Sequence, residues 1–481
     1  MNIRRILFNL GKIVSLEGVL LLLPCITGLI YREWRTALSY LAAAVFALVL
    51  GKLLVDLNRK SEERIYAREG FVITASAWII MSAIGAAPFV LCGDIPSYVD
   101  AFFETVSGFT TTGASILTDV EALTHGSLFW RSFTHWIGGM GVLVLMMAIM
   151  PDTSGRTIHI MRAEMPGPVV ERILPKVRDT ATVLYLIYIA MTGVQIIFHI
   201  AGGMPMFDSV LHSLGTAGTG GFSIKADGLA GYSAYHQWVI TIFMLIFGVN
   251  FNLYYLVIIK KWKQAVKSEE LWTYLGIVAA AVLLITFNIK PLVGSWNDSV
   301  RHASFQVASI MTTTGYSTVD FNLWPSFSKS ILLLIMFIGG CAGSTAGGLK
   351  VSRALILVKK MRCELKRLIH PRTVATVHFE GKKLDERTQN GVGTYFALYA
   401  LCMAVVFFCL GLEPFDLETN ISAVVACFNN IGPGFAAVGP AASYAGYSDG
   451  ATVLLSFAML FGRLEIYPML ILLSPATWIK K

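Results

Sequence analysis

Four short turns rich in threonine and glycine recur along the chain, about a hundred residues apart. They comprise Thr111, Thr112 and Gly113, then Thr219, Gly220 and Gly221, then Thr313, Thr314 and Gly315, and last Asn430, Ile431 and Gly432. A dehydrated alkali cation needs a shell of oxygen dipoles, which backbone carbonyl groups supply. Glycine permits the dihedral angles that point successive carbonyls to one side. Four such turns around one axis are therefore predicted to form a ring that binds a metal cation.

A single turn of this kind is more simply interpreted as a polar cap on a helix, but four copies at matching places favour the ring. The third turn, with Tyr316 after it, reproduces the T-x-G-Y part of the four TVGYG loops of potassium channels. The other three turns do not, so we expect looser selectivity. In the second turn residues 215–218 offer a competing frame. We prefer the frame at Gly221, because the letters GFS there parallel GYS in the third turn.

A short helix is predicted before each turn, at residues 100–109, 206–214, 299–311 and 418–428. These stretches are too short to cross a membrane. Backbone that is not helical at membrane depth is tolerated only when it is buried in protein or lines a water-filled cavity. Because a longer apolar run lies on each side of every short helix and its turn, the sequence predicts four re-entrant units.

The composition places these units in a membrane. Of 481 residues, 55% are hydrophobic and only 14% are charged, which excludes an ordinary soluble protein. Runs of about 20 apolar residues are long enough to span the hydrocarbon core. Ten such runs are predicted, at residues 13–31, 36–57, 70–92, 127–150, 179–201, 236–260, 269–289, 327–358, 391–411 and 450–473.

The predicted fold is an all-α polytopic membrane protein, with two leading transmembrane helices and four pseudo-symmetric repeats around a central pore. Each repeat consists of a transmembrane helix, a pore helix, a filter loop and a second transmembrane helix. The expected divisions are the leading helices (1–69), repeat 1 with a cytoplasmic linker (70–178), repeat 2 (179–268), repeat 3 with a glycine-rich loop and a linker (269–389) and repeat 4 (390–481).

The basic residues indicate the orientation. Lysine and arginine concentrate in segments 58–68, 152–178, 260–267 and 359–387, which alternate with connections nearly free of them. Because basic loops stay in the cytoplasm and the number of spans is even, both termini are expected there. The net charge of +8 is explained in the same way, and a nucleic-acid partner is not expected.

A second glycine-rich segment, residues 339–350, interrupts the eighth apolar run. Its candidate gating residues are Gly343, Ser344, Thr345, Ala346, Gly347, Gly348 and Lys350. So many glycines are expected to break the helix and leave a flexible loop beneath the filter. The alternative is close helix packing through Gly343 and Gly347 at small-xxx-small spacing. Lys350 follows the loop, and its side chain is expected simply to extend its ammonium group to the cytoplasm.

Arg463 lies in the middle of the last predicted span, where a charge costs about 2.5–3.5 kcal/mol unless it faces a cavity or a partner. Residues two apart on a helix do not face each other, so Glu465 is expected to bond another span. We predict a fixed positive charge near the inner mouth of the filter. Near the short helices, Glu104, Asp208 and Glu418 are expected either to concentrate cations at the outer mouth or only to brace the turns.

The chain resembles the superfamily of potassium transporters that includes bacterial TrkH, TrkG and KtrB and plant HKT proteins. The resemblance covers nearly the whole chain, and the turns TTTGAS and TTTGYS, the segment HWIGGMG at 135–141 and residues 339–350 look most like TrkH. It implies potassium uptake across the bacterial inner membrane, with rubidium and sodium as further candidate ions and no organic cofactor. It also implies a homodimer with one pore per protomer, an intramembrane gate at residues 339–350, and a cytoplasmic nucleotide-binding partner, TrkA, that uses NAD or ATP.

Two other classes of function compete with an ion channel. An ion-coupled secondary transporter, a K+/H+ or K+/Na+ symporter, also uses internal repeats and broken helices, but such proteins show two inverted halves rather than four units of one orientation. An intramembrane enzyme would need catalytic or metal-ligating side chains that converge in the spans, and we find no such set in the sequence.

Overall fold

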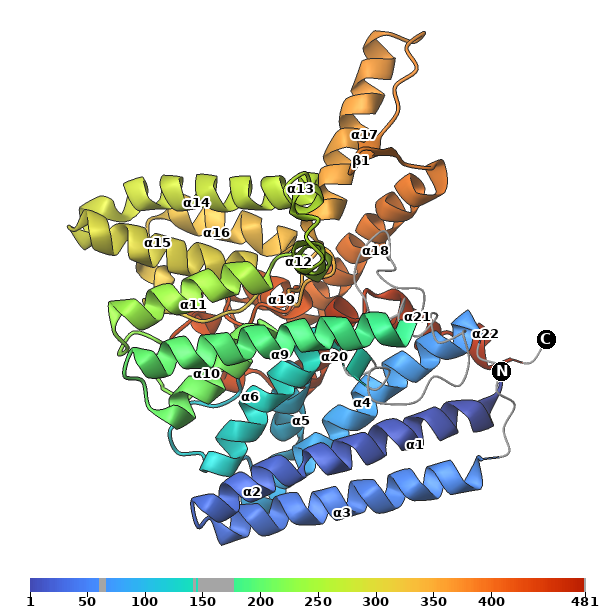
Figure 1. Cartoon of the computed structure of the whole chain (residues 1–481), viewed down its shortest axis with the longest axis vertical. Coiled ribbons are helices and arrows are strands. Elements are labelled where there is room, and N and C mark those ends of the chain that lie inside the picture. The colour runs from blue at the N-terminus through green and yellow to red at the C-terminus, as the bar shows by residue number, and fades with distance from the viewer. Residues whose placement is uncertain (60–65, 142–143, 146–176, 480–481) are drawn as a thin grey trace.

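The computed structural model describes residues 1–59, 66–141, 144–145 and 177–479. Long helices run roughly parallel through the body, and both marked termini lie at the same end of it (Figure 1). The predicted cytoplasmic segment 152–178 and the end of the predicted span 127–150 lie mostly outside the described residues. The boundaries expected between the repeats stay predictions.

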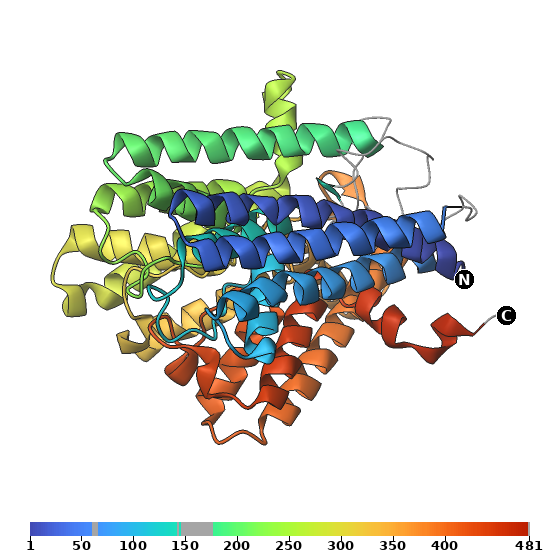
Figure 2. The same ribbon diagram turned by 90° about the horizontal axis from the view of Figure 1, so that it is seen from below.

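The two leading spans form a hairpin on the outside of the body (Figure 2). The first span consists of α1 (Ile3–Leu20) and α2 (Leu22–Ile30), and the second is α3 (Trp34–Leu57). The first begins ten residues before the predicted start at 13, because the helix continues through the basic N-terminal segment. Small residues allow close packing: a methyl group at Gly51 would meet Ser15 and the Gly11 carbonyl.

Each repeat contains a long first helix, a short second helix and a third helix. Repeat 1 has α4 (Ala67–Cys92), α5 (Tyr98–Phe109) and α6 (His125–Met140). Repeat 2 has α9 (Val177–Ala201), α10 (Met206–Gly218), α11 (Ala234–Phe247), α12 (Phe251–Ile258) and α13 (Trp262–Ala265).

Repeats 3 and 4 follow the same order. Repeat 3 has α14 (Glu269–Val293), α15 (Trp296–Met311), the turn η1 (Phe321–Leu323), α16 (Ser326–Ile338), α17 (Val351–Ile369) and the hairpin of β1 (His378–Phe379) and β2 (Lys382–Lys383). Repeat 4 has α18 (Glu386–Leu410), α19 (Leu417–Phe428), η2 (Ala436–Val438), η3 (Tyr444–Gly446), α20 (Asp449–Arg463), α21 (Tyr467–Leu473) and α22 (Pro475–Trp478).

The four short helices are confirmed as α5, α10, α15 and α19. Three of them begin at a side-chain cap: Ser97, Ser295 and Asp416 each accept a hydrogen bond from the backbone N–H three residues later. The helix α10 continues to Gly218, so the competing frame at residues 215–218 is helical and the second turn starts at Thr219.

The repeats close into a circle. The third helix of each repeat packs against the short helix of the next one: α6 on α10, α11 on α15, α16 on α19, and α20 on α5. The last pairing returns to the first repeat, and α21 also packs against α4. The four short helices therefore surround a common centre.

Three predicted continuous spans are wrong in detail, because the third helix of repeats 2, 3 and 4 breaks. The run 236–260 is α11 and α12, bent by 90°. The run 327–358 is split by residues 339–350. The run 450–473 breaks at Glu465 and Ile466, whose φ angles are 56° and 67°. By length and composition, six helices in the described part of the chain are able to cross a membrane, or seven if the bent pair is one span.

Candidate functional site

All four short helices end in the same hydrogen-bonded turn. In each turn one residue donates its N–H to the carbonyl five residues earlier, from Thr112 to Ser107 (2.9 Å), Gly220 to Gly215 (2.9 Å), Thr314 to Ser309 (2.8 Å) and Ile431 to Ala426 (2.9 Å). The residue before it donates to the carbonyl three residues earlier, from Thr111 (3.1 Å), Thr219 (3.0 Å), Thr313 (3.1 Å) and Asn430 (3.3 Å). This pair of bonds is the Schellman motif, which satisfies carbonyls at a helix end.

The backbone of the four turns is also equivalent. Two left-handed residues flank one whose φ is not positive. The first are Thr111, Thr219, Thr313 and Asn430, with φ of 55°, 53°, 56° and 56°. The second are Gly113, Gly221, Gly315 and Gly432, with φ of 77°, 78°, 84° and 97°. A left-handed residue costs about 1–2 kcal/mol when it is not glycine, and threonine is especially unsuited to it. Such strain is concentrated at functional sites.

The four turns touch one another in a closed ring. A methyl group on each left-handed glycine would overlap a carbonyl of the following turn: Gly113 on Gly220, Gly221 on Thr314, Gly315 on Ile431, and Gly432 on Thr112. Only glycine allows this approach. Because the last contact returns to the first turn, the four turns surround a shared axis.

Polar atoms line a cavity on one side of the ring and also lie buried within the ring. On one side, a cavity of about 370 Å³ is lined by the four left-handed glycines and by residues that follow them, among them Ser115, Ser223 and Ser317. At the ring itself, the buried Thr111 Oγ1 and Asn430 Oδ1 have no hydrogen-bond partner among the described residues. The Asn430 amide group donates to Thr112 Oγ1 (3.0 Å) and to the Met459 carbonyl (2.9 Å), which fixes the direction of Oδ1.

The repeated threonines have separate tasks. In the first and third turns the first threonine donates its hydroxyl to the helix, from Thr110 to Val106 (2.7 Å) and from Thr312 to Ala308 (2.7 Å). It also bonds the third threonine of the triplet, at 2.8 Å in turn 1 and 2.7 Å in turn 3. The triplet therefore both caps the helix and fixes the residue before the glycine.

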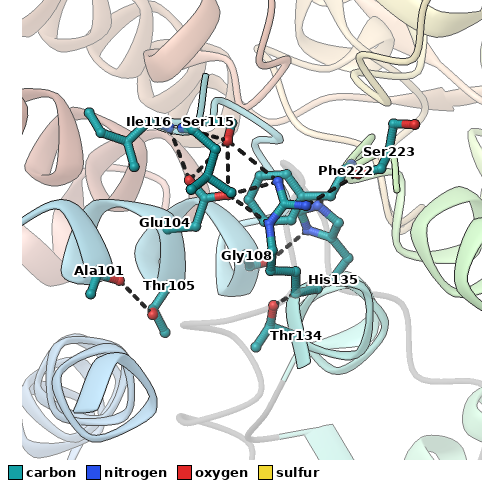
Figure 3. A network of polar contacts seen from close by, with 12 residues as sticks. Ala101, Glu104, Thr105, Gly108, Ser115, Ile116, Thr134, His135, Phe222 and Ser223 are labelled. Carbon is teal, nitrogen blue, oxygen red and sulfur yellow. Dashed lines mark hydrogen bonds and ion pairs between the residues drawn. The ribbon is translucent and has the colours of Figure 1, made fainter. Parts of the chain in front are cut away.

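A buried ion pair supports the first turn (Figure 3). The Glu104 carboxylate contacts Arg131 Nε (2.8 Å) and Nη2 (2.7 Å), and both side chains are almost fully buried. Glu104 also accepts the Ile116 N–H (3.0 Å), and Arg131 donates to the Ser223 carbonyl of the second repeat (3.2 Å). Glu104 is thus a brace for the turn. Nearer the surface, Asp208 accepts the Tyr232 hydroxyl (2.8 Å) and Glu418 pairs with Lys329 (2.9 Å).

His135 connects turns 1 and 2. Its Nε2 accepts the Phe222 N–H (3.2 Å), so Nδ1 carries the proton and donates to the Gly108 carbonyl (2.8 Å). The ring lies directly against Gly220, where no Cβ would fit. This explains the HWIGGMG segment, because Gly138 and Gly139 likewise allow α6 to approach Phe109 and Gly218.

We expect Arg131→Met or Glu104→Gln alone to lower the apparent melting temperature of the purified protein and to reduce ion uptake strongly. Removing one partner leaves a buried charge unpaired, which typically costs about 3–5 kcal/mol. The double variant should recover part of the lost stability. Lys225→Met is the control, because Lys225 and Glu121 form an exposed pair (3.5 Å) at the same mouth. Equal melting temperatures for Arg131→Met and Lys225→Met would contradict the bracing role.

Residues 339–350 form a loop on the opposite side of the ring from the 370 Å³ cavity. Gly347 donates its N–H to Thr313 Oγ1 (2.6 Å), and a Cβ there would meet the Asn429 carbonyl. The loop also touches repeat 2: Cys341 N–H donates to the Gly248 carbonyl (2.9 Å). It is not helical, so the interpretation of Gly343 and Gly347 as a helix-packing motif is wrong. Ser344, Thr345, Ala346 and Gly348 all belong to this loop.

The loop closes on itself at its base. Lys350 N–H donates to the Ile338 carbonyl (2.8 Å), and Gly348 lies against Gly339. The Lys350 side chain is only 3% exposed and its ammonium group bonds the Ala346 carbonyl within the loop. The Lys350 side chain therefore does not extend to the cytoplasm, because its ammonium group bonds the Ala346 carbonyl of its own loop.

Arg463 is the last residue of α20 rather than a mid-span residue. Its guanidinium group donates to the Thr345 carbonyl of the loop (2.9 Å) and to the Gly138 and Gly139 carbonyls at the end of α6 (2.5 and 2.7 Å). A cation is favourable at a helix C-terminus. Glu465 bonds another helix, as expected, through Arg353 Nη2 (2.6 Å). Arg463 thus connects the loop to repeats 1 and 4.

Sequence reasoning missed two charged residues. Arg131 lies inside the predicted span 127–150 and Glu270 inside 269–289, where a charge by itself marks a functional or paired residue. Both residues could therefore have been singled out from the sequence as charges inside apolar runs. Their partners, however, lie 27 and at least 72 residues away in the chain, at distances that no local pattern reveals.

Comparisons with known proteins agree with this architecture. Residues 39–479 match the family model TrkH, described as a cation transport protein. The chain is 36% identical to the Trk system potassium uptake protein TrkH of Salmonella typhimurium, over 99% of this chain and all of that one. It is 34% identical to TrkG of Escherichia coli, over 99% of each.

The structure agrees as well. It superposes on the crystal structure of the potassium transporter TrkH from Vibrio parahaemolyticus with a TM-score of 0.89 and 33% identity, covering all of both chains. The predicted all-α polytopic fold with two leading helices and four repeats is confirmed. The prediction that the chain is not an enzyme agrees with the transport function of its relatives. This multi-pass membrane protein belongs to the TrkH family of cation transport proteins.

Proposed function

We propose that this protein carries potassium ions into a bacterial cell through a pore between its four repeats. The closed ring of the four turns supports this most directly, because it surrounds one axis with backbone carbonyls in strained, equivalent conformations. Relatives that match the whole chain are potassium uptake proteins. The transported ion is the only ligand that this function requires of the chain.

The filter consists of the three residues of each turn predicted above. The carbonyls of Thr112, Gly220, Thr314 and Ile431 form the narrowest layer, because each is approached by a glycine of the neighbouring turn. The unpartnered Thr111 Oγ1 and Asn430 Oδ1 add side-chain oxygens to the layer on the loop side. Because the four turns differ in sequence, rubidium should pass as well, and sodium less readily.

The loop at residues 339–350 acts as the gate. It contacts repeat 2 at Gly248, repeat 3 at Thr313 and repeat 4 at Asn429, and Arg463 joins it to repeat 1. A segment held against all four repeats beneath the filter blocks the path of an ion. Its many glycines and the absence of helix from it allow it to move.

Arg463 serves this gate in addition to placing a positive charge near the inner mouth. We expect Arg463→Gln to raise the potassium conductance of the purified protein in bilayers, because three bonds to carbonyls are lost or weakened. Arg463→Lys separates the two roles: it keeps the charge but not the planar set of donors. If Arg463→Lys has the same conductance as Arg463→Gln, the hydrogen bonds hold the gate. If Arg463→Lys conducts like the wild type and Arg463→Gln does not, the positive charge alone is responsible. Unchanged conductance in both would contradict any role in gating.

The protein is proposed to lie in the inner membrane with both termini in the cytoplasm. They lie at the same end of the body (Figure 1), and the alternation of basic connections with connections nearly free of lysine and arginine favours the cytoplasm for both termini. A homodimer is supported by α17, which projects beyond the body and exposes Met361, Leu365 and Leu368 on one face. The basic segments at 152–178 and 359–387 are the proposed surface for a TrkA-like nucleotide-binding partner.

A second candidate function is that of an ion-coupled carrier, because such proteins also contain broken helices. Expression in a bacterium that lacks potassium-uptake systems tests the function itself: growth at low potassium and rubidium uptake should be restored. The reversal potential of the purified protein in a membrane then separates a pore from a carrier. For a pore it follows the potassium gradient alone, whereas a shift with an imposed proton or sodium gradient would identify a carrier.

A further inference from the structure

Glu270, a buried carboxylate at the start of α14, binds both ends of the proposed gate. Its Oε1 accepts the Ala342 N–H (2.8 Å) and the Ser352 N–H (3.0 Å). Ala342 lies early in the loop, and Ser352 follows the loop at the start of α17. The side chain is only 5% exposed, and it forms no ion pair with the residues that the structure describes. One carboxylate oxygen therefore holds together a residue early in the loop and a residue just after the loop.

The position of Glu270 is fixed from the cytoplasmic side by a second carboxylate. Glu380, in the turn between β1 and β2, accepts the N–H groups of Glu269 (3.2 Å) and Glu270 (3.1 Å) and the Ser268 hydroxyl (2.8 Å). These are the free N–H groups of the first turn of α14, where a negative charge is favourable. Glu380 thus caps the helix that carries Glu270.

The hairpin is also tied to α17. Lys359 on α17 donates to the His378 carbonyl of β1 (2.8 Å) and pairs with Glu269. Displacement of α17 or of the hairpin therefore acts on the first turn of α14. From there the contacts continue through Glu270 to the loop, and through Gly347 to Thr313 in the filter.

We propose that Glu270 is the latch that holds the intramembrane loop in its blocking position, and that Glu380 is the positioning residue that aligns it from the cytoplasmic hairpin. This inference rests on the proposed gating role of the loop. A motion of the hairpin and α17 withdraws the Glu270 carboxylate from Ala342 and Ser352. The two ends of the loop then separate, and the loop moves away from the filter.

The effect of a substitution follows from the bonds. Hydrogen bonds to a charged acceptor are about twice as strong as neutral ones. Glu270→Gln keeps the shape but replaces a carboxylate oxygen with an amide, so we expect an increase of roughly tenfold in the ratio of open to closed channels. Glu270→Asp keeps the charge on a shorter side chain and should lie between wild type and Gln. Glu380→Gln should act in the same direction with a smaller increase.

The test is single-channel recording of the purified full-length protein in potassium-containing bilayers, without a partner. The control is Asp56→Asn, which changes an exposed carboxylate near the end of α3 in the leading hairpin. A second readout is the rate at which Cys341, buried in the loop, is modified by a thiol reagent from the cytoplasmic side. For this readout Cys363, Cys402 and Cys409 are replaced by serine in every variant. A residue that only stabilised the fold would not change both readouts together.

The latch predicts that Glu270→Gln raises the open probability and the rate of Cys341 modification by similar factors, while Asp56→Asn changes neither. A loop-shortened variant, with residues 341–346 replaced by two glycines, separates the latch from the gate. If this variant conducts strongly but Glu270→Gln and Glu380→Gln both behave like wild type, the latch is wrong and the gate stands. If the loop-shortened variant conducts no more than wild type, the gate is wrong and the latch is wrong with it.

Discussion

Gly315→Asp is expected to abolish rubidium uptake while the protein still reaches the membrane, and Gly113→Asp is expected to do the same. Both glycines have a positive φ, and any Cβ would overlap a carbonyl of the neighbouring turn, Ile431 for Gly315 and Gly220 for Gly113. The new side chain must displace that carbonyl from the ring, and the left-handed backbone adds about 1–2 kcal/mol. The measurement is rubidium uptake in cells that lack other potassium-uptake systems.

Gly203→Asp is the matched control for this experiment. Gly203 has a φ of 88° in an exposed outer turn, but a Cβ there meets nothing within 4 Å. It should transport normally, since the backbone strain is similar and the clash is missing. Normal uptake by Gly315→Asp and Gly113→Asp would contradict the filter and favour a carrier with its ion site elsewhere.

Replacing residues 341–346 by two glycines should raise the potassium leak by more than about tenfold. The replacement is geometrically feasible because Gly339 and Gly348, at the base of the loop, are already in contact. It removes the contacts to Gly248 and to Arg463 that place the loop beneath the filter. The measurement is conductance of the purified protein in bilayers at a fixed amount of protein.

A combined variant shows whether this leak passes through the pore. Gly315→Asp added to the loop-shortened protein should eliminate the leak, because the same ions must still cross the filter. Potassium should also remain preferred over sodium in the loop-shortened protein alone. A leak that persists in the combined variant would mean that the shortened loop had damaged the membrane body instead of opening a gate.

The repeated turns were predictable because their signal is local and recurs four times. Each short helix was found within a few residues of its observed position, and the glycine-rich segment was expected to be non-helical. The loss of helix at Glu465 and Ile466 was not predictable, because neither residue type favours a left-handed conformation. The bend after α11 had only Gly248 as a signal, and a single glycine is tolerated in many helices.

The environment of the filter was less predictable than its residues. Threonine at a positive φ contradicts local preference, so the conformation of Thr111, Thr219 and Thr313 follows from the ring and not from propensity. Arg131 and Glu270 were visible as charges in apolar runs. The pairing of Arg131 with Glu104, and of Glu270 with the loop, depends on how distant segments pack.

The central claim is that one ring of four turns binds the transported ion, and anomalous diffraction from crystals soaked in thallium, a surrogate for potassium of similar size, tests it most directly. The account predicts anomalous density on the axis between the repeats, surrounded by the carbonyls of Thr112, Gly220, Thr314 and Ile431. Density away from this axis, for example at the bend between α11 and α12, with none inside the ring, would contradict it.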